Sequence, residues 1–126
     1  MSKEHILVIE DEDDIQELVR YTLLKEGFRV TVAGDGESGV EKARAGGFDL
    51  ILLDLMLPGI DGMEVCRILQ GDPRTSALPV IMITARSEES DGVSGLRLVA
   101  AGYNKKPFSP KVLLAPLPKV LRRRSR

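Results

Sequence analysis

Three apolar segments of the chain each end at side chains that could bind a metal ion or a phosphate. Ile-Leu-Val-Ile leads into Glu10 and Asp11, Leu-Ile-Leu-Leu into Asp54, and Val-Ile-Met-Ile into Thr84. Runs of four apolar residues are typical of strands that are buried on both faces. If these strands are parallel neighbours, their carboxyl ends line one edge of the sheet. We therefore expect Asp11, Asp54 and Thr84 to meet, although they are far apart in the sequence.

This set of side chains indicates phosphoryl chemistry. Converging carboxylates repel one another unless a cation offsets their charge, and Mg²⁺ is typically held by one or two carboxylates together with phosphate oxygens. Asp11 and Asp54 fit that demand, and Mn²⁺ is a possible substitute. Thr84 could donate a hydrogen bond to a phosphoryl oxygen, and Lys106 could supply a positive charge to the same group. In phosphoryl transfer, positioning and charge neutralisation do most of the catalysis, and a carboxylate can act as the nucleophile, giving an acyl phosphate.

Composition indicates one globular domain. The chain has 126 residues, of which 43% are hydrophobic and 29% charged, and no apolar run approaches the ~20 residues that a membrane span needs. We expect a soluble protein without a signal peptide, and the single Cys66 fits a reducing compartment, the cytoplasm. The net charge of −1 argues against general nucleic-acid binding by the domain. We assign residues 1–121 to the domain and the basic residues 122–126 to the start of a linker.

Apolar spacing and turn residues predict alternating strands and helices in the first two thirds of the chain. We expect strands over residues 6–9, 28–33, 50–54 and 80–84, and helices over residues 13–26, 37–45 and 61–70. Asp13 or Asp14 could cap the first helix. A long polar loop should span residues 71–79. His5, the only histidine, is interpreted as an exposed residue without a role, and Cys66 as a core residue.

The pattern weakens after residue 85. Gly92 and Gly95 fall inside the presumed fourth helix, and each costs ~1 kcal/mol relative to alanine. Residues 100–104 have poor strand propensity, yet they are interpreted as a fifth strand that carries the chain back to Lys106. Pro116 and Pro118 should end or kink the last helix near residue 115, because an interior proline costs ~3 kcal/mol or more.

Four segments in this order resemble the receiver domains of two-component response regulators. They are Ile-Leu-Val-Ile-Glu-Asp-Glu at residues 6–12, Asp-Leu-Ile-Leu-Leu-Asp-Leu-Met-Leu-Pro at 49–58, Val-Ile-Met-Ile-Thr-Ala at 80–85 and Lys-Pro-Phe at 106–108. Within that family the chain is most similar to receivers attached to winged-helix transcription factors. The resemblance implies a flavodoxin-like α/β fold of five parallel strands in the order 2-1-3-4-5.

The resemblance also implies a role for each matching residue. Asp54 would accept a phosphoryl group from a sensor histidine kinase. Asp11 would bind Mg²⁺ directly, Glu10 through water and Met56 through its backbone carbonyl. The remaining roles belong to groups that contact the phosphoryl group or respond to it: Lys106 would pair with it, Thr84 would reorient to bind it, and Tyr103 would turn inward. That two-state change would carry the signal to the face made by helix four, strand five and helix five. This face would control the output of the protein, which is transcription in the related factors.

The expected output face departs from the family pattern. The family usually has Gly-Ala-Asp-Asp-Tyr where this chain has Val-Ala-Ala-Gly-Tyr at residues 99–103. Positions that carry interfacial charges in the transcription-factor group are neutral or altered here, Pro116 among them. This departure argues against the usual symmetric homodimer across that face. The effector domain that would bind DNA is not within this chain, and neither membrane binding nor direct nucleic-acid binding by the domain is expected.

Three classes of function share parts of this pattern. The first is the phospho-accepting receiver, which is not a turnover enzyme and catalyses only its own phosphorylation and dephosphorylation. The second is a phosphohydrolase with an Asp nucleophile, but that mechanism needs a second Asp two residues later, where this chain has Met56. The third is a degenerate receiver that binds a partner without phosphorylation. A dinucleotide site is disfavoured, because the acidic residues 10–14 would repel a pyrophosphate.

Overall fold

A five-stranded parallel sheet forms the centre of the molecule, with the strand order β2-β1-β3-β4-β5. The computed structural model describes residues 4–54, 57, 59–84 and 100–105, with residues 83, 84 and 100–105 described by their backbone. The strands are β1 (His5–Ile9), β2 (Arg29–Ala33), β3 (Leu50–Asp54), β4 (Val80–Thr84) and β5 (Ala100–Lys105). This topology confirms the flavodoxin-like α/β fold and its strand order.

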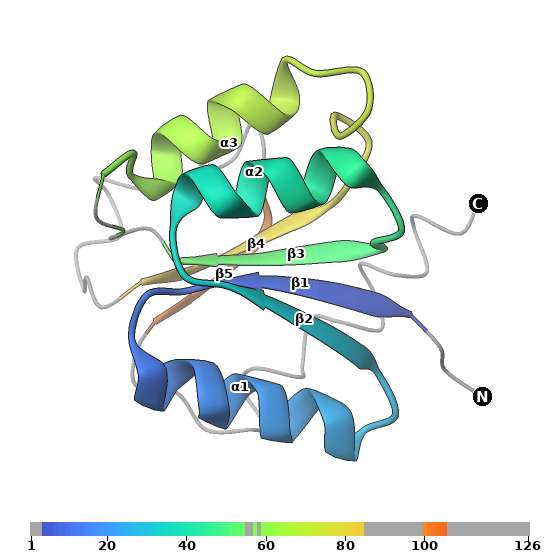
Figure 1. Ribbon diagram of the computed structural model, residues 1–126, viewed down its shortest axis with the longest axis vertical. Coiled ribbons are helices and arrows are strands. Elements are labelled where there is room, and N and C mark those ends of the chain that lie inside the picture. Colours follow the sequence, from blue (N-terminus) through green and yellow to red (C-terminus); the bar gives the residue numbers. More distant parts are fainter. Residues whose placement is uncertain (1–3, 55–56, 58, 85–99, 106–126) are drawn as a thin grey trace.

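Helices lie on both faces of the sheet. They are α1 (Asp13–Lys25), α2 (Gly36–Ala45) and α3 (Gly62–Gln70). Figure 1 shows α2 and α3 side by side over one face and α1 over the other. From β1 to β4, each strand is joined to the next through a helix, which is the usual connection between parallel strands. In the described ranges, no helix is long and apolar enough to span a membrane.

The two faces of the sheet form separate apolar cores. Leu7 and Ile9 of β1 belong to the core under α2 and α3, whereas Ile6 and Val8 belong to the core under α1. This alternation follows from the two-residue period of a strand. Both β1 and β3 lie inside the sheet with helices on each side, so neither face can be polar. The continuous apolar runs of the sequence are explained by this double burial.

The predicted core position of Cys66 is confirmed. Its Sγ lies 3.6 Å from Met82 Sδ, so the thiol of α3 contacts β4 in the core. Burial raises the pKa of the Cys66 thiol to about 12. A thiol in this environment stays protonated at neutral pH and behaves as a small apolar group.

The helix starts differ in how they are capped. Asp35 accepts a hydrogen bond from the Ser38 amide at the start of α2, and Asp61 accepts one from the Glu64 amide at the start of α3. The prediction for α1 was wrong, because the N-cap residue is Glu12 and it makes no side-chain capping bond. Asp13 and Asp14 lie in the first turn, where their charges favour the positive end of the helix dipole.

His5 is not an exposed bystander. It is half-buried in β1, its Nε2 lies 2.7 Å from Thr31 Oγ1 of β2, and its ring centroid lies 4.5 Å from that of Phe48. The His5 amide also donates to Asp49 Oδ2 at 2.9 Å. The side chain therefore joins the amino ends of β1 and β2 and the start of β3. The sequence position alone, next to the beginning of a strand, did not reveal these contacts.

The predicted loop over residues 71–79 is built around a buried carboxylate. Asp72 Oδ2 accepts from Arg44 Nε of α2 at 2.7 Å and from Arg74 Nη2 at 2.9 Å, while Oδ1 accepts from the Arg74 amide at 2.9 Å. Thr75 is also buried, and its hydroxyl donates to the Leu69 carbonyl at 2.7 Å. These bonds fix the loop against the ends of α2 and α3.

The fifth strand is confirmed and runs from Ala100 to Lys105. It pairs with β4 along its length, with a register shift between Val80 and Ile81. Pairing with β4 stabilises this segment as a strand despite its poor intrinsic strand propensity. The fourth helix, the last helix with Pro116 and Pro118, and the basic tail over residues 122–126 lie outside the described residues.

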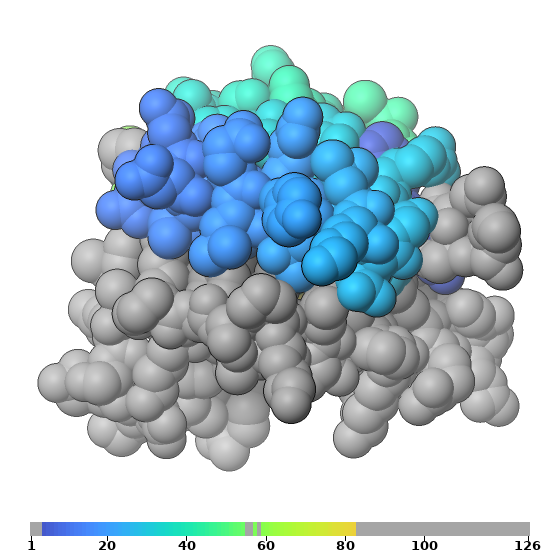
Figure 2. Space-filling view, turned by 90° about the horizontal axis from the view of Figure 1, so that it is seen from below, coloured from blue at the N-terminus to red at the C-terminus, as the bar shows by residue number. Residues whose placement is uncertain are grey.

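The outer surface of α1 is partly apolar. Its residues, in blue, form part of the surface that Figure 2 shows. Leu18 is 37% exposed, Tyr21 64% and Leu24 46%. On the opposite side of the helix Val19 and Leu23 are fully buried against the sheet.

Gly39 sets how closely α2 packs on β1. A methyl group built on Gly39 would lie 2.4 Å from Ile9 Cδ1 and 2.7 Å from Ile9 Cγ1. Overpacking of a core usually costs ~1–3 kcal/mol and occasionally more. We expect Gly39→Val to lower the free energy of unfolding by about 2–4 kcal/mol in urea denaturation, since Ile9 is completely buried and has no free space to enter. Glu41→Val, at an exposed position of the same helix, is the control for helix propensity. An equal loss in both variants would contradict the packing argument.

Asp72 should make stability pH-dependent. Hydrogen bonds from Arg74, and then from Arg44, hold the pKa of the Asp72 carboxyl well below its usual range. A carboxyl with a lowered folded-state pKa contributes stability above its unfolded pKa of about 4, and loses it as the pH falls toward the folded value. We expect the destabilisation by Asp72→Asn to be larger at pH 7 than at pH 3 in urea denaturation. Glu17→Gln, which removes an exposed carboxylate, is the charge control, and an Asp72→Asn effect that is the same at both pH values would refute the linkage.

Candidate functional site

The register of the central strands brings the candidate residues to one edge of the sheet. Ile9 of β1 is paired with Leu53 of β3. The residues that follow them, Glu10 and Asp54, therefore lie side by side. Asp54 is paired with Ile83 of β4, and Thr84 follows at the same edge. The parallel direction of all three strands therefore places these residues at their common carboxyl end.

Three carboxylates converge there. One oxygen from each of Glu10, Asp11 and Asp54 lies within 4.8 Å of the other two. Glu10 is fully buried and Asp54 is 1% exposed, whereas Asp11 is exposed to solvent. The site therefore has a buried floor made by β1 and β3 and an open side at Asp11.

Hydrogen bonds hold the segment that carries two of these carboxylates. The Glu10 amide donates to the Ala33 carbonyl at 3.0 Å, which joins the end of β1 to the end of β2. The Glu12 amide donates to Glu10 Oε2 at 2.9 Å. The carboxylate of Glu10 therefore has a fixed direction before any ligand arrives.

The donor set fits a hard divalent cation. All three groups are carboxylates, and Mg²⁺ and Mn²⁺ prefer such oxygen ligands over sulfur or imidazole. Bringing three negative charges within 4.8 Å, two of them buried, is unfavourable unless a positive charge offsets them. Glu10, Asp11 and Asp54 are the described residues that could hold the ion.

The structure places some of the other predicted site residues by their backbone. Thr84 is the last residue of β4 and is paired with Lys105 of β5, and Tyr103 of β5 is paired with Met82. Thr84 thus reaches the same edge as Asp54, as predicted. Met56 and Lys106 lie outside the described residues, so their expected roles remain predictions.

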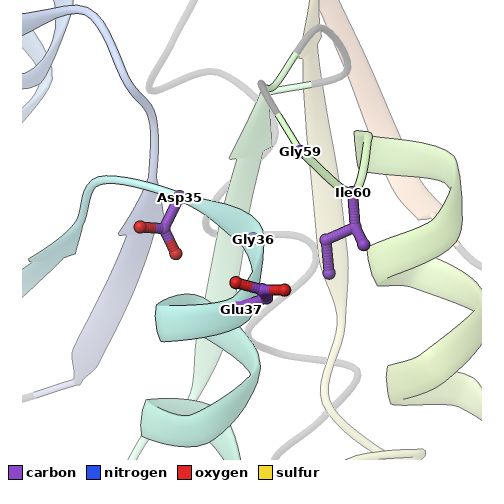
Figure 3. Close-up of a pocket in the computed structure, with 5 residues that line it drawn as sticks. All are labelled: Asp35, Gly36, Glu37, Gly59 and Ile60. Atoms are coloured by element: carbon purple, nitrogen blue, oxygen red, sulfur yellow. The ribbon is translucent and has the colours of Figure 1, made fainter.

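A pocket lies between the start of α2 and the segment before α3. Asp35, Gly36, Glu37, Gly59 and Ile60 line it. Figure 3 shows the Ile60 side chain extending toward the first turn of α2. A methyl group built on Gly36 would lie 2.7 Å from Ile60 Cγ1. Glycine at this position therefore allows the two segments to approach.

One residue at the site was missed in the sequence. Gln16 of α1 is half-buried, and its Nε2 donates to the backbone carbonyl of Glu10. A signal was present, because side chains in the first turns of a helix point back toward its N-terminus. A polar residue between the core residues Ile15 and Val19 could therefore have been assigned to the preceding acidic loop.

The fold and the acidic cluster define a class of protein: a flavodoxin-like α/β domain with a candidate site for a divalent cation and a phosphate. The family model for the response regulator receiver domain matches residues 6–117 of the chain. The chain belongs to the response regulator receiver domain family. The resemblance inferred from the four sequence segments is thus confirmed.

Similar proteins support the assignment. The chain is 46% identical to the sensory transduction protein RegX3 of Mycolicibacterium smegmatis over 118 residues, which are 94% of this chain and 50% of that protein. It is 46% identical to the phosphate regulon transcriptional regulatory protein PhoB of Klebsiella pneumoniae, with 94% of this chain and 52% of that protein covered. The chain therefore spans about half the length of these relatives. A crystal structure described as a response regulator from Chloroflexus aurantiacus superimposes with a TM-score of 0.89 at 30% identity, covering 96% of this chain and 99% of the other.

The acidic cluster predicts metal binding that depends on Asp11. We expect Asp11→Asn to raise the dissociation constant for Mn²⁺ about tenfold or more, since it removes the exposed carboxylate of the cluster. Titration of the protein with Mn²⁺, monitored by the electron paramagnetic resonance signal of the free ion, measures this constant. Asp14→Asn, an exposed aspartate three residues later, should leave it within about twofold. Equal weakening by both variants would indicate only general electrostatic attraction.

Proposed function

We propose that this domain accepts a phosphoryl group on Asp54 in a reaction that depends on Mg²⁺. The observation that carries the proposal is the position of Asp54, which is buried at the end of β3 with carboxylate oxygens of Glu10 and Asp11 within 4.8 Å. Membership of the receiver family supports the same role for Asp54. The proposed donor is a phosphohistidine of a sensor histidine kinase.

In the proposed step, an oxygen of Asp54 attacks phosphorus while the bond between phosphorus and the donor imidazole nitrogen breaks. The electron pair of that bond returns to the imidazole, and the product is an acyl phosphate on Asp54. A bound Mg²⁺ would supply positive charge next to the phosphoryl oxygens. The chain contributes a fixed carboxylate nucleophile at the end of a central strand and two further carboxylates that hold the cation.

Further residues are assigned on the basis of the family match. Thr84, at the same sheet edge, would donate its hydroxyl to a phosphoryl oxygen, and Lys106 would pair with the phosphoryl charge. Met56 would offer its backbone carbonyl to the cation, with Glu10 acting through water. Tyr103 of β5 would respond to the movement of Thr84. In this proposal the domain is not a turnover enzyme and acts in the cytoplasm.

The output is proposed from the relatives. PhoB of Klebsiella pneumoniae is named a transcriptional regulatory protein, and the chain covers about half of it. We propose that this domain regulates transcription through an effector segment that corresponds to the other half of such relatives. The partners are then a histidine kinase, which delivers the phosphoryl group, and a DNA-binding effector.

Intact mass after incubation with acetyl phosphate tests the acceptor role. We expect the wild-type chain to gain the mass of one phosphoryl group with Mg²⁺ and not after removal of Mg²⁺ by a chelator. Asp54→Asn should gain none, because an amide lacks the nucleophilic carboxylate oxygen. Asp14→Asn, which removes an exposed aspartate outside the cluster, should be phosphorylated like the wild type.

Circular dichroism must show that each variant is folded. A folded wild-type chain that gains no mass would reject the acceptor role and favour the degenerate receiver, which binds a partner without phosphorylation. A gain that persists in Asp54→Asn would place the acceptor on another residue.

A further inference from the structure

We propose that Gln16 positions the metal-binding segment of the acidic cluster. This inference rests on the proposed function, because it concerns how the cluster is held for Mg²⁺. Gln16 is the fourth residue of α1 and is half-buried. It lies outside the cluster itself, and its amide would act through the backbone of the segment that carries Glu10 and Asp11.

Hydrogen bonds close a ring around Asp11. The Glu12 amide donates to Glu10 Oε2 at 2.9 Å, and the Gln16 amide donates to the Glu12 carbonyl at 2.9 Å. Gln16 Nε2 then donates back to the Glu10 carbonyl. Starting at Glu10, the contacts run through Glu12 to the helix and return to Glu10 through the Gln16 side chain. Asp11 is the one residue between the two fixed positions.

The ring matters most for Asp11, because that residue is exposed. Glu10, which follows β1, and Asp54, which ends β3, are held by burial, whereas solvent around Asp11 provides no such packing. Its direction therefore depends on the backbone on either side. Without the Gln16 side chain, the Glu10 carbonyl loses its link to α1, and the peptide between Glu10 and Asp11 gains freedom to rotate.

The neighbouring turn also fits this arrangement. A methyl group built on Gly34 would lie 3.9 Å from Gln16 Nε2, so the chain leaving β2 passes beside the amide. The Glu10 amide is bonded to Ala33, the residue before Gly34. Gln16 therefore bonds to the residue that follows β1 and lies near the residue that follows β2. Groups that orient metal ligands in this way typically change metal affinity ~10–100-fold when removed.

Gln16→Met is the direct test, because methionine keeps the length of the side chain and removes its donor. We expect the dissociation constant for Mn²⁺, measured on the protein with the metal alone, to rise about tenfold. With acetyl phosphate, the Mg²⁺ concentration for half-maximal phosphorylation should rise by a similar factor, while the rate at saturating Mg²⁺ stays within about twofold. Gln70→Met, the same chemical change at an exposed position at the end of α3, should change neither quantity.

A second variant separates positioning from folding. Gln16→Asn keeps an amide that is one methylene too short to reach the Glu10 carbonyl, and it should weaken Mn²⁺ binding as Gln16→Met does. Urea denaturation shows whether each variant is folded at the temperature of the titration. A folded Gln16 variant that binds Mn²⁺ within twofold of the wild type would overturn the inference. A wild-type chain that binds no Mn²⁺ would instead overturn the metal site and the proposed function with it.

Discussion

The candidate site depends on the parallel sheet, which brings like charges together at one of its edges. Because β1 and β3 are adjacent and parallel, the carboxylates that follow Ile9 and Leu53 must lie side by side. Two unit charges 4 Å apart repel by ~1 kcal/mol in water and by ~4 kcal/mol at the effective dielectric constant near a protein surface. Glu10 and Asp54 are buried, so solvent screens them poorly. A cation bound at this edge would offset the repulsion between these carboxylates.

The surrounding elements restrict movement at this edge from both faces of the sheet. On one face, α2 approaches so closely at Gly39 that it rests on Ile9, the last residue of β1. On the other face, α1 follows directly after the acidic segment and bonds back to it through Gln16. The end of β1 is therefore held between two helices. The carboxylates that follow it are held in position before a ligand binds. Such preorganisation reduces the entropic cost of binding.

Stabilising polar contacts collect at the opposite edge. Loops that lead into the amino ends of strands carry Asp72, whose carboxylate joins Arg44 of α2 to Arg74 in the loop before β4. His5, at the amino end of β1, contacts Thr31 and Phe48. The carboxylate of Asp72 is paired with two arginines, whereas the described cluster at the carboxyl edge brings together the carboxylates of Glu10, Asp11 and Asp54. The sheet thus separates residues that hold the fold together from residues that are suited to bind a ligand.

Much of this protein follows from local pattern. The apolar runs ending at Asp54 and Thr84 predicted buried parallel strands, because only double burial tolerates so many consecutive apolar residues. The same pattern predicted that Asp11 and Asp54 meet, since parallel strands share one carboxyl edge, and the described cluster contains both. The family motifs added the strand order. The weak fifth strand was predicted over residues 100–104, because the chain had to return to Lys106, and β5 runs over Ala100–Lys105.

Tertiary structure decided the features that depend on which side chains meet across elements. Several of these contacts join polar residues whose types alone suggest only solvated positions. They are the bond from Gln16 to the Glu10 carbonyl, the contact of His5 with Thr31, and the bonds from Arg44 and Arg74 to Asp72. The N-cap of α1 is likewise Glu12, and not the predicted Asp13 or Asp14. Periodicity in a sequence reports burial, which is a property of single residues. Hydrogen bonds between distant polar groups depend on relative position, and the chain acquires that only when its helices pack on the sheet.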